Sequence, residues 1–150
     1  MPEGPPRGLS APVLLDNSAW ARLAAPGLSH TRSSEVADAL EDGLIATCLP
    51  FLLEAGYSAR HARDHAELLD ELRAIPHFAI DDAVERRAVD AQRQLARVGH
   101  HRLPPVDLLV AALADHHGLG ILHYDHDYDL LADRTDLVFE SVWLAPRGSL

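Results

Sequence analysis

The chain contains no lysine, because all thirteen of its basic residues are arginine. Phosphate-binding loops and phosphate-handling enzymes that depend on a lysine ammonium are therefore disfavoured. Cysteine is almost absent too. With Cys48 alone, no disulfide can form within the chain and a four-cysteine zinc site is excluded. We expect a protein that works in a reducing compartment, namely the cytoplasm.

Long apolar runs are also missing. No stretch approaches the roughly 18 consecutive apolar residues of a membrane span, and the opening segment lacks the apolar run of a secretory signal. We therefore expect a soluble protein without a membrane partner. The Pro- and Gly-rich residues 1–12 are interpreted as a disordered lead-in, and residues 13–150 fit one domain with a single core.

Positive charge is scarce, since thirteen basic residues stand against twenty-three acidic ones and give a net charge of −10. Non-specific binding of nucleic acid depends on neutralising phosphates, so any contact of this chain with nucleic acid must be local. Residues 60–102 hold most of the arginines. A solvated helical face with paired charges is the common meaning of such a pattern, and a surface that guides a nucleic-acid strand is the alternative.

Short apolar runs alternate with helical patterns along the chain. The runs have the length and composition of buried strands, and the segment at residues 106–114 is apolar on nearly every side, as in a buried helix. This order predicts an α/β domain with a mostly parallel sheet of roughly four to five strands, covered by helices on both faces. The expected strands lie at residues 13–15, 44–46, 78–80, 121–123 and 138–144. Ser33 or Ser34 is expected to cap a helix that ends at Gly43, and Thr47 is expected to cap the helix that carries Glu54.

Acidic residues stand where ligands collect in such folds. Asp16 follows the first expected strand, and Asp125 and Asp127 follow the fourth, at the carboxyl ends where open α/β sheets bind their ligands. Asp107 lies in the first turn of the apolar helix, and Glu54 lies in a helix whose neighbouring residues suit a core. An unpaired carboxylate is costly in such surroundings, so each of these acids needs a partner.

Carboxylates that share a site raise one another's pKa and destabilise the fold unless a cation lies among them. Lysine is absent, and the segments that carry these acids contain no arginine. A divalent ion bound through oxygen is the simplest solution, and carboxylate and water ligands favour Mg²⁺ or Mn²⁺ over zinc. Such ions polarise phosphoryl oxygens and generate hydroxide, so the predicted chemistry is hydrolysis of phosphodiester bonds.

Each acid taken alone has a simpler explanation. Asp16 or Asp107 is more often a helix cap than a metal ligand, and the acids of the Tyr-Asp-His-Asp-Tyr segment at residues 124–128 usually serve a turn. Their joint placement is what favours a metal site.

Four motifs in one order carry a resemblance to a known family. The first resembles the opening strand motif of PIN domains, in which an apolar run ends in a metal-binding Asp. The second, third and fourth are similar to the segments that bear the family's Glu, its third acid and its fourth acid. The motifs are LLDNSAW at 14–20, IAT at 45–47 with LEA at 53–55, PVDLLVAA at 105–112 and LHYDHDYD at 122–129. The resemblance covers about residues 13–144.

The resemblance implies a PIN-like three-layer α/β/α sandwich over residues 13–150 and a metal-dependent endoribonuclease. It further implies that one or two Mg²⁺ or Mn²⁺ ions are held by four catalytic acids, with Asp127 as a further ligand or a close neighbour of the ligands. Ser18 would orient a water molecule on the ion. The four acids are Asp16, Glu54, Asp107 and Asp125.

Within the PIN-domain class the chain looks like the toxin of a VapBC toxin–antitoxin pair. This resemblance implies an RNA substrate, a VapB-type antitoxin that blocks the site, and a homodimer. Two positions depart from the family pattern: His123 stands where Thr or Ser is frequent, and Tyr128 stands where Phe is usual. Both departures leave the acids intact.

Two other functions stay open. A phosphate-accepting receiver or haloacid-dehalogenase-type domain also places acids at strand ends around Mg²⁺, but those families use a lysine that this chain lacks. A catalytically silent PIN domain that acts only by binding a partner is the second, and only an activity assay separates it from a nuclease.

Several histidines are further candidates for a site. His61 and His65 have the spacing of a zinc pair, yet no third ligand is evident, and a solvated pair is expected. The His-His-Arg run at residues 100–102 is interpreted as a polar loop, with contact to an RNA backbone as the alternative.

Overall fold

The structure, a computed structural model, describes residues 8–150. Residues 1–7 are not described, so most of the lead-in expected at residues 1–12 lies outside the described residues. Residues 8–12 run without helix or strand into the first strand. The division into a disordered lead-in and one domain stays a prediction.

Five strands form one sheet in the order β3-β2-β1-β4-β5, and every neighbouring pair is parallel. The chain builds the sheet outward from β1 to β3 and then returns to the other side of β1 for β4. β1 and β4 are therefore neighbours where the winding changes direction, which is where open α/β sheets bind ligands. The strands are β1 (Val13–Leu15), β2 (Ile45–Cys48), β3 (His77–Phe78), β4 (Gly120–His123) and β5 (Ser141–Trp143).

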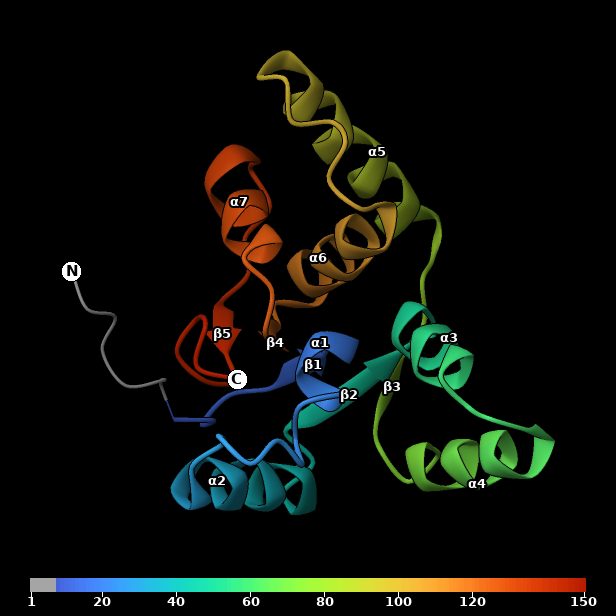
Figure 1. Cartoon of the computed structure of the whole chain (residues 1–150). Coiled ribbons are helices and arrows are strands. Elements are labelled where there is room, and N and C mark those ends of the chain that lie inside the picture. The colour runs from blue at the N-terminus through green and yellow to red at the C-terminus, as the bar shows by residue number, and fades with distance from the viewer. Residues whose placement is uncertain (1–7) are drawn as a thin grey trace.

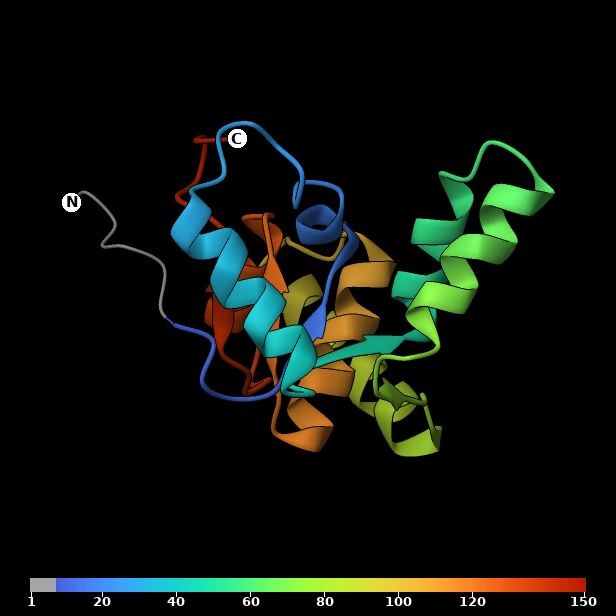
Figure 2. The same cartoon turned by 90° about the horizontal axis from the view of Figure 1, so that it is seen from below.

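Helices cover both faces of this sheet. In Figures 1 and 2, α5, α6 and α7 lie on one face, α2 lies on the opposite face, and α3 and α4 form a pair beside the β3 edge. This arrangement confirms the predicted three-layer α/β/α sandwich, with a sheet that is parallel throughout. The helices are α1 (Asn17–Trp20), α2 (His30–Glu41), α3 (Leu49–Tyr57), α4 (Ala62–Leu72), α5 (Asp82–Arg97), α6 (Pro105–His117) and α7 (Asp127–Arg134).

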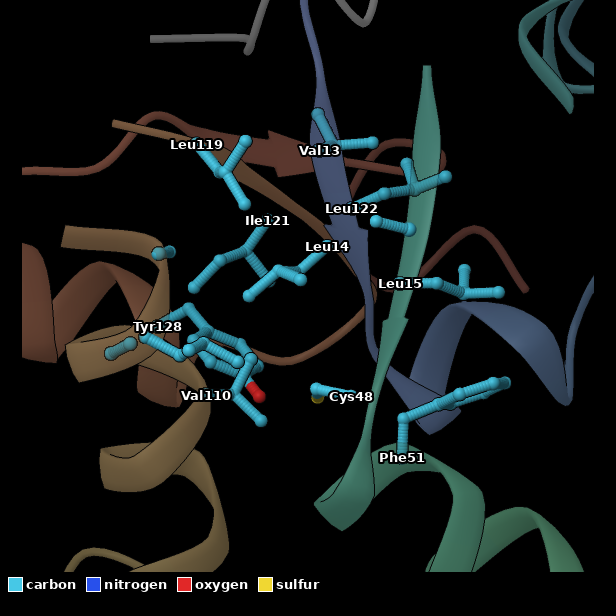
Figure 3. Packing of buried hydrophobic residues seen from close by; sticks show 14 of the residues in the cluster. Val13, Leu14, Leu15, Cys48, Phe51, Val110, Leu119, Ile121, Leu122 and Tyr128 are labelled. Atoms are coloured by element: carbon cyan, nitrogen blue, oxygen red, sulfur yellow. The ribbon is translucent and has the colours of Figure 1, made fainter. Parts of the chain in front are cut away.

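The core lies between the sheet and α6. Leu14 of β1 and Ile121 of β4 are fully buried, and they pack with Val110 of α6 (Figure 3). Parallel strands covered on both faces need apolar side chains on both sides, which explains the continuous apolar runs. Most of α6 is buried because α5 packs over its outer side. The expectation of a buried helix at residues 106–114 is thus confirmed.

Several predicted element boundaries are wrong, and hydrogen bonds explain two of them. Helix α2 was expected to begin after Ser33 or Ser34, but it begins at His30 because the Ser29 hydroxyl accepts the backbone N–H of Arg32. Thr47 was expected to cap α3. Instead it lies within β2, where its backbone N–H donates to the Pro76 carbonyl at 2.8 Å. The last strand is shorter than expected and covers only residues 141–143.

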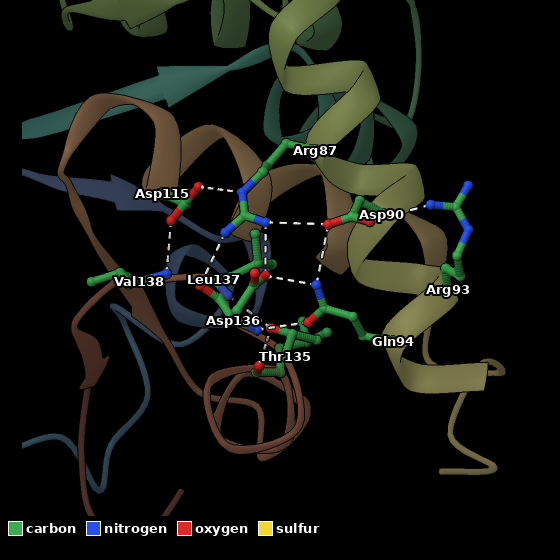
Figure 4. Close-up of polar contacts among 10 residues, drawn as sticks. Arg87, Asp90, Arg93, Gln94, Asp115, Thr135, Asp136, Leu137 and Val138 are labelled. Atoms are coloured by element: carbon green, nitrogen blue, oxygen red, sulfur yellow. Dashed lines mark hydrogen bonds and ion pairs between the residues drawn. The ribbon is translucent and has the colours of Figure 1, made fainter. Parts of the chain in front are cut away.

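Arg87 of α5 ties three parts of the fold together (Figure 4). Its guanidinium donates to Asp115 of α6 at 2.9 Å and to Asp136, beyond α7, at 2.7 Å. Asp115 also accepts the backbone N–H of Val138 at 2.8 Å, and Gln94 exchanges two hydrogen bonds with Asp136. The planar guanidinium of an arginine has several N–H donors and can make these contacts at once, whereas the ammonium group of a lysine is a single point of charge.

Other arginines of residues 60–102 form exposed pairs with acids close to them in the chain. They join residues three or four positions apart, as the interpretation of a solvated helical face requires. The pairs are Arg60–Asp64, Arg63–Glu67, Arg73–Asp70 and Arg93–Asp90. The alternative, contact with a nucleic-acid strand, stays a prediction for these and the remaining arginines.

Replacing Arg87 by Ala is expected to lower the free energy of unfolding by about 2–3 kcal/mol, because the largely buried Asp115 loses its charged partner. Arg93→Ala removes an exposed pair with Asp90 and should cost less than about 0.5 kcal/mol. Urea unfolding followed by circular dichroism measures both changes. Equal losses in the two variants would show that the Arg87 network does not join the helices energetically.

Candidate metal centre

Acidic side chains gather at the carboxyl ends of β1 and β4. Asp16 follows β1 directly, Asp125 lies two residues beyond β4, and Asp127 is the first residue of α7. Asp107 reaches the same place from the first turn of α6. One carboxylate oxygen each from Asp107, Asp125 and Asp127 lies within 4.8 Å of the other two. These three residues are called the three-acid cluster below.

Asp16 is both a helix cap and a part of the site. Its Oδ2 accepts the backbone N–H of Ser18 at 3.0 Å and also accepts the Ser18 hydroxyl. Its Oδ1 accepts the hydroxyl of Tyr128 at 2.6 Å. The side chain is buried, so Asp16 is held in one orientation by α1 on one side and by α7 on the other. The structure does not include it in the three-acid cluster.

Asp107 carries the clearest sign of a missing positive charge. It is 7% exposed, and within residues 8–150 its Oδ2 is the one buried side-chain oxygen or nitrogen without a hydrogen-bond partner. Burial raises the pKa of Asp107, and the negative charges of the other acids, beginning with Asp16 and Asp125, add to the effect and bring the pKa to about 7. The start of α6 offsets part of this cost, because the helix dipole favours a carboxylate there.

Asp125 and Asp127 form the turn that enters α7. The backbone N–H of Asp127 donates to Oδ1 of Asp125 at 2.9 Å, so Asp125 also has the turn role that its sequence context indicates. Burial and the charge of Asp125 raise the pKa of Asp127, whereas His126 lowers it. The turn brings both carboxylates toward Asp107.

Glu54 stands at the rim of the site. It lies on α3, outside the three-acid cluster, and its side chain is partly buried. Burial raises the pKa of Glu54, and the charges of Asp16 and Asp125 add to the effect. Glu54 is therefore electrostatically coupled to the other acids. It also lines an apolar groove of about 490 Å³ between α3 and the start of α6, formed with Leu49, Pro50, Leu53, Tyr57, Ile80, Val106 and Leu109.

These residues fit a divalent cation. The five acids offer only carboxylate oxygens, and one of those oxygens is buried without a partner. Among residues 8–150 no arginine or histidine forms an ion pair with any of the five. Hard oxygen ligands in this number suit Mg²⁺ or Mn²⁺. The acids predicted as ligands are Asp16, Glu54, Asp107, Asp125 and Asp127, and their direct coordination stays a prediction.

Ser18 has contacts that the sequence does not reveal. Its hydroxyl donates to Asp16 and accepts the backbone N–H of Tyr124 at 2.9 Å, so that it joins the ends of β1 and β4. Its predicted role in orienting water stays a prediction, because these two contacts already position the hydroxyl within the protein.

Two residues of the site were not predicted as functional, and both are the departures from the family pattern. Tyr128 donates its hydroxyl to Asp16. His123 is fully buried, and its Nδ1 accepts the backbone N–H of Asp125 at 3.0 Å. The Nε2–H of His123 donates to Ser141 at 2.7 Å, since Nδ1 is already an acceptor. Burial lowers the pKa of His123 to about 4, so the ring is a neutral support for the Asp125 turn.

Two of the other histidines, His61 and His100, have local partners. Nδ1 of His61 accepts the backbone N–H of Asp64 at 3.2 Å, which makes His61 the cap of α4. Nε2 of His100 contacts the guanidinium of Arg134 on α7. Within the described part of the chain, the one group of acids, histidines and cysteines with metal-ligand spacing is the three-acid cluster.

Comparisons with known proteins agree on one family. A family model described as the PIN domain matches residues 13–134. The chain is 36% identical over 138 residues to Ribonuclease VapC21 of Mycobacterium tuberculosis, covering 91% of this chain and 96% of that protein. Ribonuclease VapC18 of the same organism is 36% identical over 139 residues, covering 91% and 97%.

Solved structures support the same fold. DNA-bound VapBC from Salmonella typhimurium contains a similar chain with a TM-score of 0.69 and 14% identity, covering 90% of this chain and 99% of that one. VapBC-5 from Mycobacterium tuberculosis contains another, with a TM-score of 0.59 and 24% identity over 88% and 99%. At these identities the likeness concerns the fold alone.

The high pKa of Asp107 predicts a pH dependence of stability in the metal-free protein. The pKa in the fold is about 7, against an ordinary value of 3.8. The stability that protonated Asp107 contributes is therefore fully present when the pH is below 3.8, and it is lost as the pH rises through about 7. In EDTA, we expect the thermal midpoint of the wild-type protein to fall from about pH 5 to about pH 8 more steeply than that of Asp107→Asn.

Asp133→Asn is the matched control, because Asp133 is an exposed acid whose removal leaves the site unchanged. The thermal midpoint of Asp133→Asn should fall with pH as steeply as that of the wild type. Differential scanning calorimetry over the same pH series measures both. Identical slopes for wild type and Asp107→Asn would contradict the high pKa of this carboxylate.

Proposed function

This chain belongs to the PIN-domain family, among the VapC ribonucleases, and on that basis we propose that it is a metal-dependent endoribonuclease that acts as the toxin of a type II toxin–antitoxin pair. The observation that carries the proposal is the buried, unpartnered Oδ2 of Asp107, a member of the three-acid cluster. An acid in that position is tolerated when a cation is bound beside it.

The ion is proposed to be Mg²⁺ or Mn²⁺, held by the three-acid cluster together with Asp16 and Glu54. A divalent ion bound there supplies the Lewis acidity that polarises a phosphodiester and lowers the pKa of water. Asp107, Asp125 and Asp127 approach one another from two helices and a turn, which supports their role as ligands. Asp16 and Glu54 contribute negative charge from β1 and α3, as the shifted pKa values of Asp107 and Glu54 indicate.

The side chains around the acids hold the site in shape. Ser18 and Tyr128 fix the carboxylate of Asp16, and His123 supports the turn that carries Asp125. Because Tyr128 and His123 are fully buried, the carboxylate and the turn that they contact have little freedom to move, and substrate positioning can use a preformed site. No covalent intermediate with the protein is needed, since water is the proposed nucleophile.

RNA is the proposed substrate because the relatives are named ribonucleases. The net charge of −10 means that the strand must be held by local contacts and by the ion rather than by a general positive surface. Arg22 is suitably placed for such a contact: it donates to the Ser18 carbonyl at 2.9 Å and stacks over the Tyr124 ring. Selectivity for particular RNAs would depend on loop shape and single-stranded geometry.

A VapB-type antitoxin is the proposed partner, because similar folds were solved as VapBC complexes. The apolar groove beside Glu54 offers it a surface, since Leu53 and Tyr57 are 64% and 92% exposed there. A partner seated in the groove would also cover the acids. If a small reading frame lies beside the gene, its co-expression followed by a cleavage assay of the complex tests this proposal, and undiminished cleavage by a complex that forms would contradict it.

A homodimer and a cytoplasmic location complete the proposal. The homodimer rests on the resemblance to VapC-type toxins, and the location follows from an RNA substrate and a single cysteine. No helix among residues 8–150 has the length and apolar character needed to cross a membrane.

Cleavage of RNA should require a divalent ion and the three-acid cluster. We expect activity with Mg²⁺ or Mn²⁺, none in EDTA, and a loss of at least about 100-fold in Asp107→Asn and Asp125→Asn. Asp133→Asn is again the control and should cleave like the wild type. A gel assay on structured RNA, with the three variants at equal concentration, measures these rates.

Asp107→Asn is the most informative variant because it should change activity and stability in opposite directions. The variant should be less active than the wild type yet more stable at about pH 8 without metal, because the same charge that serves the reaction opposes folding. Metal-dependent cleavage that survives in both acid variants would overturn the assignment of the site. A wild-type protein that binds the ion but cleaves no RNA would favour the silent PIN domain instead.

A further inference from the structure

Tyr128 carries a polar group that packing does not require. The side chain is fully buried, and Figure 3 shows it among the core residues of β1, β4 and α6. Its ring lies against the ring of His123 at a centroid distance of 4.9 Å and meets Phe139 edge-on at 6.5 Å. A phenylalanine ring would fill the same volume without burying an oxygen, so the core alone does not explain a tyrosine.

The hydroxyl of Tyr128 forms its hydrogen bonds with carboxylates. It donates to Oδ1 of Asp16 at 2.6 Å and lies 3.4 Å from Oδ1 of Asp107. Among residues 8–150 these two oxygens are its hydrogen-bond partners. Since a buried phenol without a partner is costly, the fold keeps the hydroxyl in this place between two acids.

The contact decides how both carboxylates are oriented. Oδ2 of Asp16 is held by Ser18, so the hydroxyl of Tyr128 at Oδ1 leaves Asp16 no freedom to rotate. Oδ1 of Asp107 faces the same hydroxyl, which leaves Oδ2 as the oxygen without a partner. A phenol donates a hydrogen bond while staying neutral, so it orders the acids without cancelling the charge that attracts a cation.

We propose that Tyr128 is a positioning residue of the metal site, whose hydroxyl fixes Asp16 and Asp107 before the ion binds. The inference rests on the proposed metal-dependent function. An ion that meets carboxylates already in place has less rearrangement to drive, so its affinity is higher than in a site whose acids are free to turn.

Tyr128→Phe removes the hydroxyl and nothing else. The full-length, metal-free wild type and variant are titrated with Mn²⁺, and free Mn²⁺ is measured by electron paramagnetic resonance. We expect the dissociation constant of the variant to rise about tenfold, as for the loss of a group that orients metal ligands. Circular dichroism and the thermal midpoint of the metal-free proteins report whether the fold is intact. A residue that only fills the core would change the midpoint and leave the Mn²⁺ affinity unchanged.

Tyr124→Phe is the matched control. It removes a hydroxyl from the neighbouring turn, where that group contacts the Pro146 carbonyl and the Leu150 backbone N–H rather than an acid. Its Mn²⁺ affinity should equal that of the wild type. In an Asp16→Asn background, Tyr128→Phe should cause a loss at least about threefold smaller than in the wild type, since one of the two carboxylates that it orients is gone.

The outcomes separate the inference from the function on which it rests. Mn²⁺ affinities of Tyr128→Phe and wild type within about twofold of each other would overturn the role of the hydroxyl and leave the metal site standing. An equal loss in Tyr124→Phe would overturn it as well, because the effect would then not be specific to the acids. A wild-type protein that binds no Mn²⁺ would overturn the proposed function together with this inference.

Discussion

Mutual repulsion of buried carboxylates is the constraint on which the site depends. Asp107 lies at the start of a helix whose middle turns are buried in the core, so its charge cannot be exposed to water without pulling α6 from the sheet. Asp125 and Asp127 enter the same space from the turn after β4. The fold thus keeps negative charge where it is costly, at the point where β1 and β4 meet. The metal chemistry, the tyrosine between the acids and the neutral histidine are all consistent with that one cost.

The layers of the fold could be predicted from the sequence because buried segments consist mainly of apolar residues. Apolar runs without alternation indicate strands covered on both faces, and the apolar segment at residues 106–114 indicates a helix inside the molecule. The residues at which helices and strands begin and end were harder to predict. Whether Ser29 or Ser33 caps α2, and whether Thr47 caps a helix or pairs with β3, depends on hydrogen bonds that several serines and threonines could make equally well.

The sequence predicted which acids lie near one another but not how they are arranged, and their role as ligands stays a prediction. Strand ends and four motifs identified the acids, but they gave Asp16, Glu54 and Asp107 equal rank. In the structure the three-acid cluster is tight, Asp16 is joined to it through Tyr128, and Glu54 stands at the rim. Such contacts join residues up to 112 positions apart and depend on rotamers, which no local pattern encodes. The only hint was that Tyr128 and His123 depart from the usual residues of the family.

Helix α6 carries a functional acid near one end, Asp107 in the site, and a structural acid near the other, Asp115 on Arg87 of α5. An α-helix turns by about 100° per residue, so one residue inserted between the two acids would turn one of them away from its place whichever end stayed fixed. The apolar middle of α6 therefore tolerates exchange of side chains of similar size far better than any change of length. Insertions and deletions should be tolerated instead in the loop at residues 98–104, where extra chain leaves the orientation of both acids unchanged.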